Sequence, residues 1–153
     1  KKIFINLEKE FILEYNKRMY LPSLFSGVLD SLNEIKAKKI KMSVLSASNQ
    51  SILTKLVAHY SLDNYFENIV GVDNYGAIGK LERGEVLIKS LGVDKKNLLI
   101  VGDTNYDYEI SLKLGVDCAL IGSGHQSYRR LSLTGATIFD SWNSFMNKSI
   151  QEN

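Results

Sequence analysis

The sequence has 153 residues, of which 44% are hydrophobic and 24% charged, a composition typical of a single ordinary globular domain. Its 19 basic and 17 acidic residues give a formal net charge of +2, too small a charge for the field of a nucleic-acid-binding protein. The longest apolar runs, such as residues 98–101, are far shorter than the roughly 20 residues that span a bilayer. We therefore expect neither a nucleic-acid partner nor a membrane segment.

The cysteine content and the first residues of the chain indicate a cellular compartment. The single Cys118 excludes an internal disulfide framework and lies in an apolar run, which favours a buried structural thiol. Lys1 and Lys2 precede a polar, amphipathic stretch that has no cleavage site of small residues, so no secretory signal is expected. Both features predict a cytoplasmic protein.

The chain begins with a predicted amphipathic helix over residues 3–20. Apolar residues recur there every four positions, at Ile3, Leu7, Phe11, Tyr15 and Met19. Pro22 ends this pattern, and the change in composition before it is the only candidate domain boundary in the chain.

Predicted helices and strands then alternate to the end of the chain. Helices are expected at residues 27–39, 52–60, 81–91, 105–114 and 126–134, the second of them capped by Ser48 or Asn49. Strands are expected at residues 40–45, 69–72, 98–101, 118–121 and 137–139. Apolar strands joined by helices indicate a doubly wound, Rossmann-like α/β fold, with a parallel sheet covered by helices on both faces. In such folds ligands bind at the carboxyl ends of the strands.

A pair of carboxylates follows the strand at residues 98–101. In the sequence GDTNYD (residues 102–107), Asp103 ends the strand and Asp107 follows one helical turn later. Two such carboxylates can hold a divalent cation such as Mg²⁺. Equally, Asp103 can be a turn residue and Asp107 a carboxylate that interacts with the helix dipole.

Two further polar residues lie where a phosphate could bind. Ser46 ends the strand at residues 40–45 and precedes a helix N-terminus, where a hydroxyl and free amides bind anions. Lys80 follows Gly79 and precedes a helix, and a lysine near a phosphate supplies a positive charge. A common strand-to-turn serine and an ordinary surface lysine are the alternatives.

Together these residues resemble the motifs of the haloacid dehalogenase superfamily. VLS (44–46), GK (79–80) and GDTNYD (102–107) are similar to its second, third and fourth motifs, in that order. The stretches LFSGV (24–28) and YFENIVG (65–71) also resemble it. The resemblance covers about residues 22–145 and is greatest to the phosphoglycolate phosphatase-like branch, in which a helical cap separates the first two motifs.

The resemblance implies a Mg²⁺-dependent phosphatase that hydrolyses a small phosphorylated metabolite through a phospho-aspartate. Ser46 and the amide of Ala47 would then bind the transferring phosphoryl group, and Lys80 would stabilise its oxygens. Asp103 would ligate Mg²⁺, and Asp107 would support the ion directly or through water.

The first motif, which supplies the nucleophilic aspartate, is absent. The nearest candidate would place Asn6 at the nucleophile position, and an amide cannot serve as one. We interpret residues 1–21 as the last helix of a helical cap and residues 22–153 as the α/β core. Because the family's first strand lies between those of the second and fourth motifs, its absence predicts a divided sheet and a chain that is a fragment of the enzyme.

Two other functions are compatible with parts of the sequence. In a non-catalytic, phosphatase-like binding module, Asn6 would be a degenerate nucleophile on a strand beside those of Ser46 and Asp103, whereas a helix at residues 3–20 would disfavour this. A receiver-like or nucleotide-binding domain fits less well, because no phosphate-binding glycine loop follows a first strand.

Overall fold

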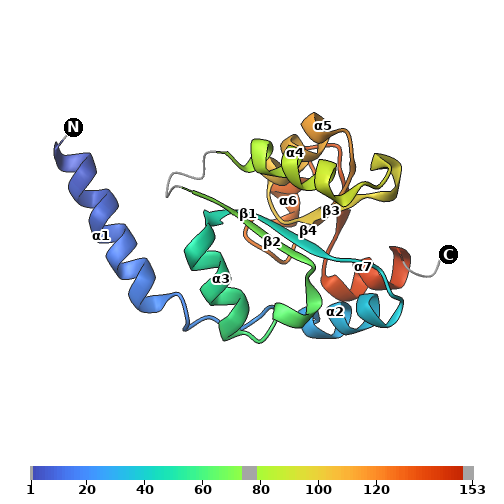
Figure 1. The fold of residues 1–153 in the computed structure, drawn as a ribbon, viewed down its shortest axis with the longest axis horizontal. Helices are drawn as coiled ribbons and strands as arrows, with labels where there is room; N and C mark the ends of the chain where they lie inside the picture. Colours follow the sequence, from blue (N-terminus) through green and yellow to red (C-terminus); the bar gives the residue numbers. More distant parts are fainter. Residues whose placement is uncertain (1, 74–78, 150–153) are drawn as a thin grey trace.

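The computed structural model describes residues 2–73 and 79–149 (Figure 1). The strands are β1 (Ser43–Asn49), β2 (Asn68–Val72), β3 (Leu99–Gly102), β4 (Asp117–Ile121) and β5 (Thr137–Phe139). The helices are α1 (Lys2–Arg18), α2 (Val28–Ala37), α3 (Gln50–His59), α4 (Lys80–Leu91), α5 (Asn105–Leu114), α6 (Tyr128–Leu131) and α7 (Trp142–Ser149), with 3₁₀ turns at Asp63–Tyr65 and Lys95–Asn97. The predicted α/β alternation is confirmed.

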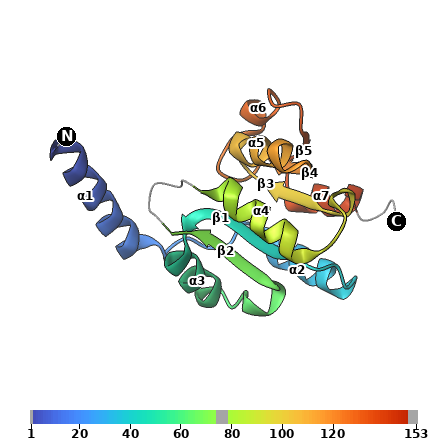
Figure 2. The ribbon, with the colours of Figure 1, turned by 45° about the horizontal axis from the view of Figure 1, so that its top comes forward.

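The strands form two separate parallel sheets. One pairs β1 with β2, and the other has the order β3-β4-β5. Figure 2 shows the strands in the order β2, β1, β3, β4, β5, so the open edges of β1 and β3 are neighbours. Within the described residues no strand joins these two edges, and unpaired edges expose backbone hydrogen-bonding groups. The division of the sheet agrees with the expectation drawn from the absent first motif.

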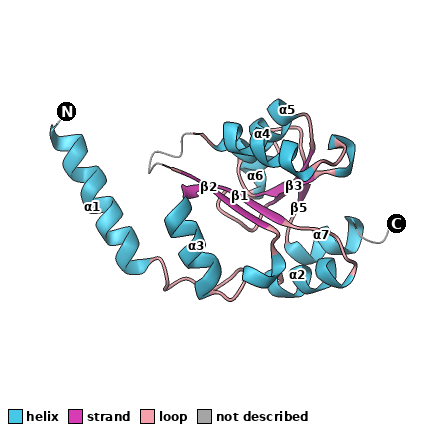
Figure 3. Ribbon diagram, in the orientation of Figure 1, coloured by secondary structure: helices cyan, strands magenta, loops and turns pink. Residues whose placement is uncertain are grey.

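Helices cover both faces of the strands, as predicted (Figure 3). α4 and α5 lie on one side, and α2, α3 and α7 lie on the other. Three groups of buried apolar side chains hold these layers together: Leu32, Leu53, Val57 and Leu62 under α2 and α3; Ile110, Leu114 and Val116 under α5; and Ala119, Ile121, Phe139, Phe145 and Met146 between β4, β5 and α7.

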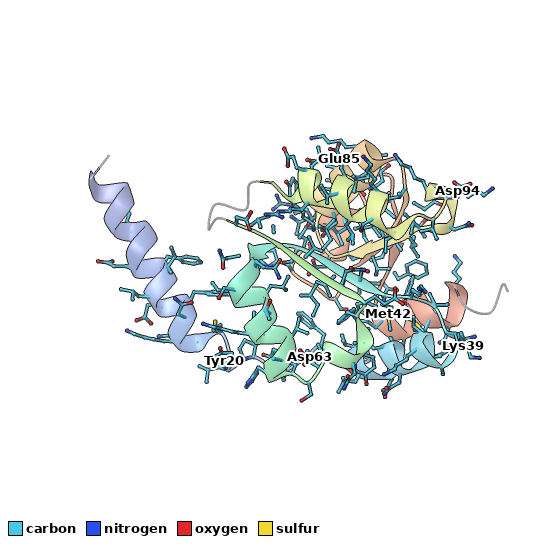
Figure 4. All side chains as sticks on the ribbon, in the orientation of Figure 1. Tyr20, Lys39, Met42, Asp63, Glu85 and Asp94 are labelled. Atoms are coloured by element: carbon cyan, nitrogen blue, oxygen red, sulfur yellow. The ribbon has the colours of Figure 1, made fainter. Side chains whose placement is uncertain are left out.

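α1 extends away from the rest of the chain (Figures 1 and 2). The helix expected over residues 3–20 is confirmed, and it leaves Phe11 69% and Leu13 59% exposed. The segment after α1 contacts the end of α3. The ring of Tyr20, labelled in Figure 4, lies 4.7 Å from that of His59, and Tyr60 Oη donates to the Pro22 carbonyl at 2.5 Å. No described helix is long and apolar enough to cross a membrane.

Two predicted elements have the wrong limits. β1 begins at Ser43, not residue 40, because Lys39 takes a positive φ of 60° at the end of α2 and the Ile40 amide still bonds back to that helix. The helix expected at residues 126–134 is only the short α6, and Gly135, with a φ of 86°, follows it. The sequence reasoning did not predict α7.

Candidate functional site

The turn between β3 and α5 is organised around the carboxylate of Asp107. Asp107 Oδ2 accepts from the amides of Asp103 (3.1 Å) and Thr104 (3.0 Å) and from Thr104 Oγ1 (2.6 Å). In return the Asp107 amide donates to Thr104 Oγ1 at 3.2 Å, which completes a capping box at the start of α5. Gly102 permits this arrangement, because a Cβ there would lie only 2.5 Å from Asp107 Cγ.

Lys80 forms a buried ion pair with the same carboxylate. Its Nζ lies 2.5 Å from Asp107 Oδ1, and each of the two side chains is only 10% exposed. Lys80 is the first residue of α4, after Gly79, whose φ is 102°. The ring of Tyr106 lies 6.0 Å from Nζ, close enough for a cation–π contact. The ion pair thus fixes the position of the Lys80 ammonium group, and Lys80 is not an ordinary surface lysine.

The charge of Lys80 decides the protonation of Asp107. Burial acts to raise the pKa of the Asp107 carboxyl, but the positive charge and hydrogen bond of Lys80, with the bonds from Thr104 and the Asp103 amide, outweigh it and hold the pKa below its ordinary value of 3.8. Asp107 is therefore ionised at neutral pH.

Asp103 is held from the other side, by the loop after β4. Its Oδ2 accepts from the His125 amide at 2.7 Å, and its carbonyl accepts from the Gln126 amide at 3.2 Å. Among the described residues no hydrogen bond involves Asp103 Oδ1. Asn105 Oδ1, two residues on, is buried and likewise has no described partner.

The oxygens of this turn suit a hard cation only in part. Carboxylate and amide oxygens are the ligands that Mg²⁺ takes, usually with phosphate and water completing the shell. The described residues contain no cluster of three or more potential metal-ligating His, Cys, Asp or Glu side chains. Asp103 thus offers one carboxylate oxygen, whereas both oxygens of Asp107 accept hydrogen bonds, from Lys80 and from the β3–α5 turn. The predicted role of Asp107 as a metal ligand stays a prediction.

Ser46 and Ala47 lie within β1, where its pairing with β2 becomes irregular between Leu45 and Asn49. Ser46 Oγ accepts from the Ser48 amide at 3.1 Å, and no described bond uses the Ser46 hydroxyl proton. Asn49 caps α3 by accepting from the Ser51 amide, as predicted for one of two candidates. No hydrogen bond between described residues joins Ser46 or Ala47 to Lys80, Asp103 or Asp107.

An apolar cavity of about 190 Å³ adjoins Asp103. Its other lining residues are Phe25, Val28, Val101, Gly102, Ser123, Gly124 and Trp142. The site at the end of β3 therefore opens onto an apolar recess.

Comparison with known proteins identifies the family. The model of the haloacid dehalogenase-like hydrolases matches residues 2–121. The chain belongs to this family. It is 25% identical over 130 residues to phosphoglycolate phosphatase 1 of Pseudomonas aeruginosa, covering 84% of this chain and 47% of that protein. It is 34% identical over 92 residues to the phosphoglycolate phosphatase of Aquifex aeolicus, covering 59% of this chain and 43% of that protein.

Solved structures agree with the fold. A haloacid dehalogenase-like hydrolase from Streptococcus pneumoniae superposes with a TM-score of 0.83 at 17% identity, covering 96% of this chain and 70% of that one. At this identity the match shows the fold alone. This haloacid dehalogenase-like chain spans about half the length of the curated relatives above.

Sequence reasoning missed the residues that hold the haloacid dehalogenase-like site in place. The capping role of Thr104 does have a signal in the sequence, because Thr-x-x-Asp before an apolar run is the pattern of a capping box. Gln126, whose Oε1 accepts from the Asn105 amide at 2.9 Å, gave no local signal. His125 lies in the loop before α6, and its amide donates to Asp103 Oδ2 at 2.7 Å.

Proposed function

We propose that the protein containing this chain is a Mg²⁺-dependent phosphatase that acts on a small phosphorylated metabolite through a phospho-aspartate. The observation that carries the proposal is the buried Lys80–Asp107 pair beside Asp103, at the carboxyl end of β3 in a haloacid dehalogenase-like chain. Phosphoryl transfer needs mainly positioned cationic groups, and Lys80 is one. The similarity to phosphoglycolate phosphatases supports this substrate class.

Each predicted site residue has a proposed task. Lys80, fixed by Asp107, stabilises the oxygens of the transferring phosphoryl group. Ser46 donates its hydroxyl proton to the same group, since its Oγ already accepts from the Ser48 amide, and the Ala47 amide assists. Asp103 would hold Mg²⁺ through its carboxylate, and the ion would neutralise charge between phosphate and protein.

The nucleophilic aspartate is proposed to lie outside this chain, on a strand that pairs with β1 and β3. In the reaction, its carboxylate oxygen bonds to phosphorus as the bond to the leaving oxygen breaks, and that oxygen takes a proton from the acid two residues after the nucleophile. Water then attacks the acyl phosphate, which releases inorganic phosphate and restores the carboxylate. The two open strand edges and the short coverage of the relatives support this placement. We further propose that α1 is the last helix of a cap and that the core begins near residue 22.

The alternative of a non-catalytic module is less well supported. It needs Asn6 on a strand beside β1 and β3, whereas Asn6 lies inside α1.

Phosphate release from p-nitrophenyl phosphate by the complete protein tests the proposal. Hydrolysis should stop on addition of EDTA, return with Mg²⁺, and fall at least a hundredfold in Asp103→Asn, since the ion loses its anionic ligand (roughly 10²-fold per charge-stabilising group). Glu67→Gln, on the exposed Lys41–Glu67 pair, is the matched control and should keep full activity. Hydrolysis that is unaffected by Asp103→Asn would rule out the proposal.

A further inference from the structure

The loop between β4 and α6 lies directly against the β3–α5 turn and bonds to it at three points. His125 donates its amide to Asp103 Oδ2 (2.7 Å), and Gln126 donates its amide to the Asp103 carbonyl (3.2 Å). The Gln126 side chain then reaches past Asp103, and its Oε1 accepts from the Asn105 amide at 2.9 Å. We call residues 122–127 the clamp loop. It holds the Asp103 carboxylate, the Asp103 carbonyl and the Asn105 amide.

Gly124 of the clamp loop leaves no room for a side chain beside Asp103. A Cβ at Gly124 would lie 2.5 Å from Asp103 Oδ2 and closer still to Asp103 Cβ. A clash with Cβ cannot be relieved by rotating the carboxylate, because Cβ is the root of the side chain. Any larger residue at position 124 must therefore push Asp103 and the clamp loop apart.

The contact has a consequence for the two oxygens of Asp103. The His125 amide holds Oδ2, so Oδ1 is the oxygen left without a described partner. Fixing one carboxylate oxygen orients the other, and groups that orient a metal ligand in this way commonly change metal affinity 10–100-fold when they are lost.

We propose that Gly124 and Gln126 are positioning residues that aim Asp103 Oδ1 at the metal. This inference rests on the proposed function, because it takes Asp103 as the ligand. Neither residue contacts Lys80 or Ser46 through a described hydrogen bond, so each acts on the phosphate site only through Asp103.

The test measures Mn²⁺ binding to the complete protein by EPR, with Mn²⁺ as a spectroscopic substitute for Mg²⁺. Gly124→Ala should weaken binding by about tenfold or more. Ser127→Ala is the matched control in the same loop: the Ser127 side chain is exposed and makes no capping bond to α6, so affinity should stay within twofold.

Gln126→Met and Gln126→Glu provide a second pair that introduces no clash. Methionine removes the acceptor for the Asn105 amide and should weaken Mn²⁺ binding, whereas glutamate keeps an oxygen there and should restore it. In an Asp103→Asn background Gly124→Ala should cause no further loss, because the ligand that it positions is already gone.

The outcomes separate the two proposals. If Asp103→Asn weakens Mn²⁺ binding but Gly124→Ala and Gln126→Met both bind as tightly as the parent, the positioning role is wrong and the metal site stands. If Asp103→Asn leaves Mn²⁺ binding unchanged, the metal site itself fails, and the positioning role fails with it.

Discussion

Asp107→Asn should destabilise the protein strongly, because the buried carboxylate uses both of its oxygens. Oδ1 accepts from Lys80, and Oδ2 accepts from the amides of Asp103 and Thr104 and from the Thr104 hydroxyl. Asparagine has only one side-chain oxygen, so its NH₂ group must face either the Lys80 ammonium or the three donors of the turn. Either orientation sets donor against donor and leaves a buried cation without its counter-charge.

The size of the loss follows from burial. With both side chains only 10% exposed, removing one partner should cost about 3–5 kcal/mol of unfolding free energy. The exposed pair Lys41–Glu67, with 77% and 47% exposure, is the control, and Glu67→Gln should cost about 1 kcal/mol or less.

Urea unfolding followed by circular dichroism measures both variants in the complete protein. Lys80→Met should also be destabilising, and the double variant should lose less than the sum of the two single losses, since they remove one interaction. If Asp107→Asn costs no more unfolding free energy than Glu67→Gln, Asp107 does not hold Lys80 in a buried ion pair.

Three further predictions concern acid, packing and thiol chemistry. The pKa of Asp107 is held below 3.8 in the folded protein, so the carboxylate stabilises the fold fully above that pH and loses this effect as pH falls through the folded-state pKa. The difference in unfolding free energy between the parent and Asp107→Asn should therefore be constant from pH 5 to 7 and shrink below pH 4. A difference that grows in acid would contradict this. Gly102→Ala should lower the unfolding free energy measured in urea by about 1–3 kcal/mol, because the new Cβ would lie 2.5 Å from Asp107 Cγ. An unchanged unfolding free energy would show that this contact is not tight. Burial raises the pKa of the Cys118 thiol, so the native protein should react slowly with Ellman's reagent at pH 8 and quickly in urea, and equal rates would be the contrary result.

Local patterns made much of the fold predictable. The four-residue apolar spacing of residues 3–20 gave α1, and strand-helix alternation gave the parallel α/β architecture. The absent first motif predicted the divided sheet. The short α6 was harder, because the predicted first residue, Gln126, is instead held in the preceding loop by a bond from its amide to the Asp103 carbonyl, and a long-range contact of this kind is not visible in periodicity.

The candidate site was only partly predictable, because its key contacts join distant segments. Lys80 and Asp107 are 27 residues apart, and nothing local in either motif says that one neutralises the other. The sequence motif predicts that Asp103 ligates the metal and that Asp107 supports it directly or through water, and both roles stay predictions. The bond from Lys80 to Asp107 and the open Asp103 Oδ1 became visible only in the structure. The contact of Gly124 with Asp103 depends on how two loops pack, which a glycine in the sequence does not reveal.

The most direct test of the central claim is a crystal structure of the complete protein with Mn²⁺ and inorganic phosphate, read by the anomalous signal of the metal. We expect Mn²⁺ about 2.1 Å from Asp103 Oδ1, phosphate within hydrogen-bonding distance of Lys80 Nζ and Ser46 Oγ, and an added strand between β1 and β3. Mn²⁺ bound away from Asp103, or phosphate bound away from Lys80, would contradict it.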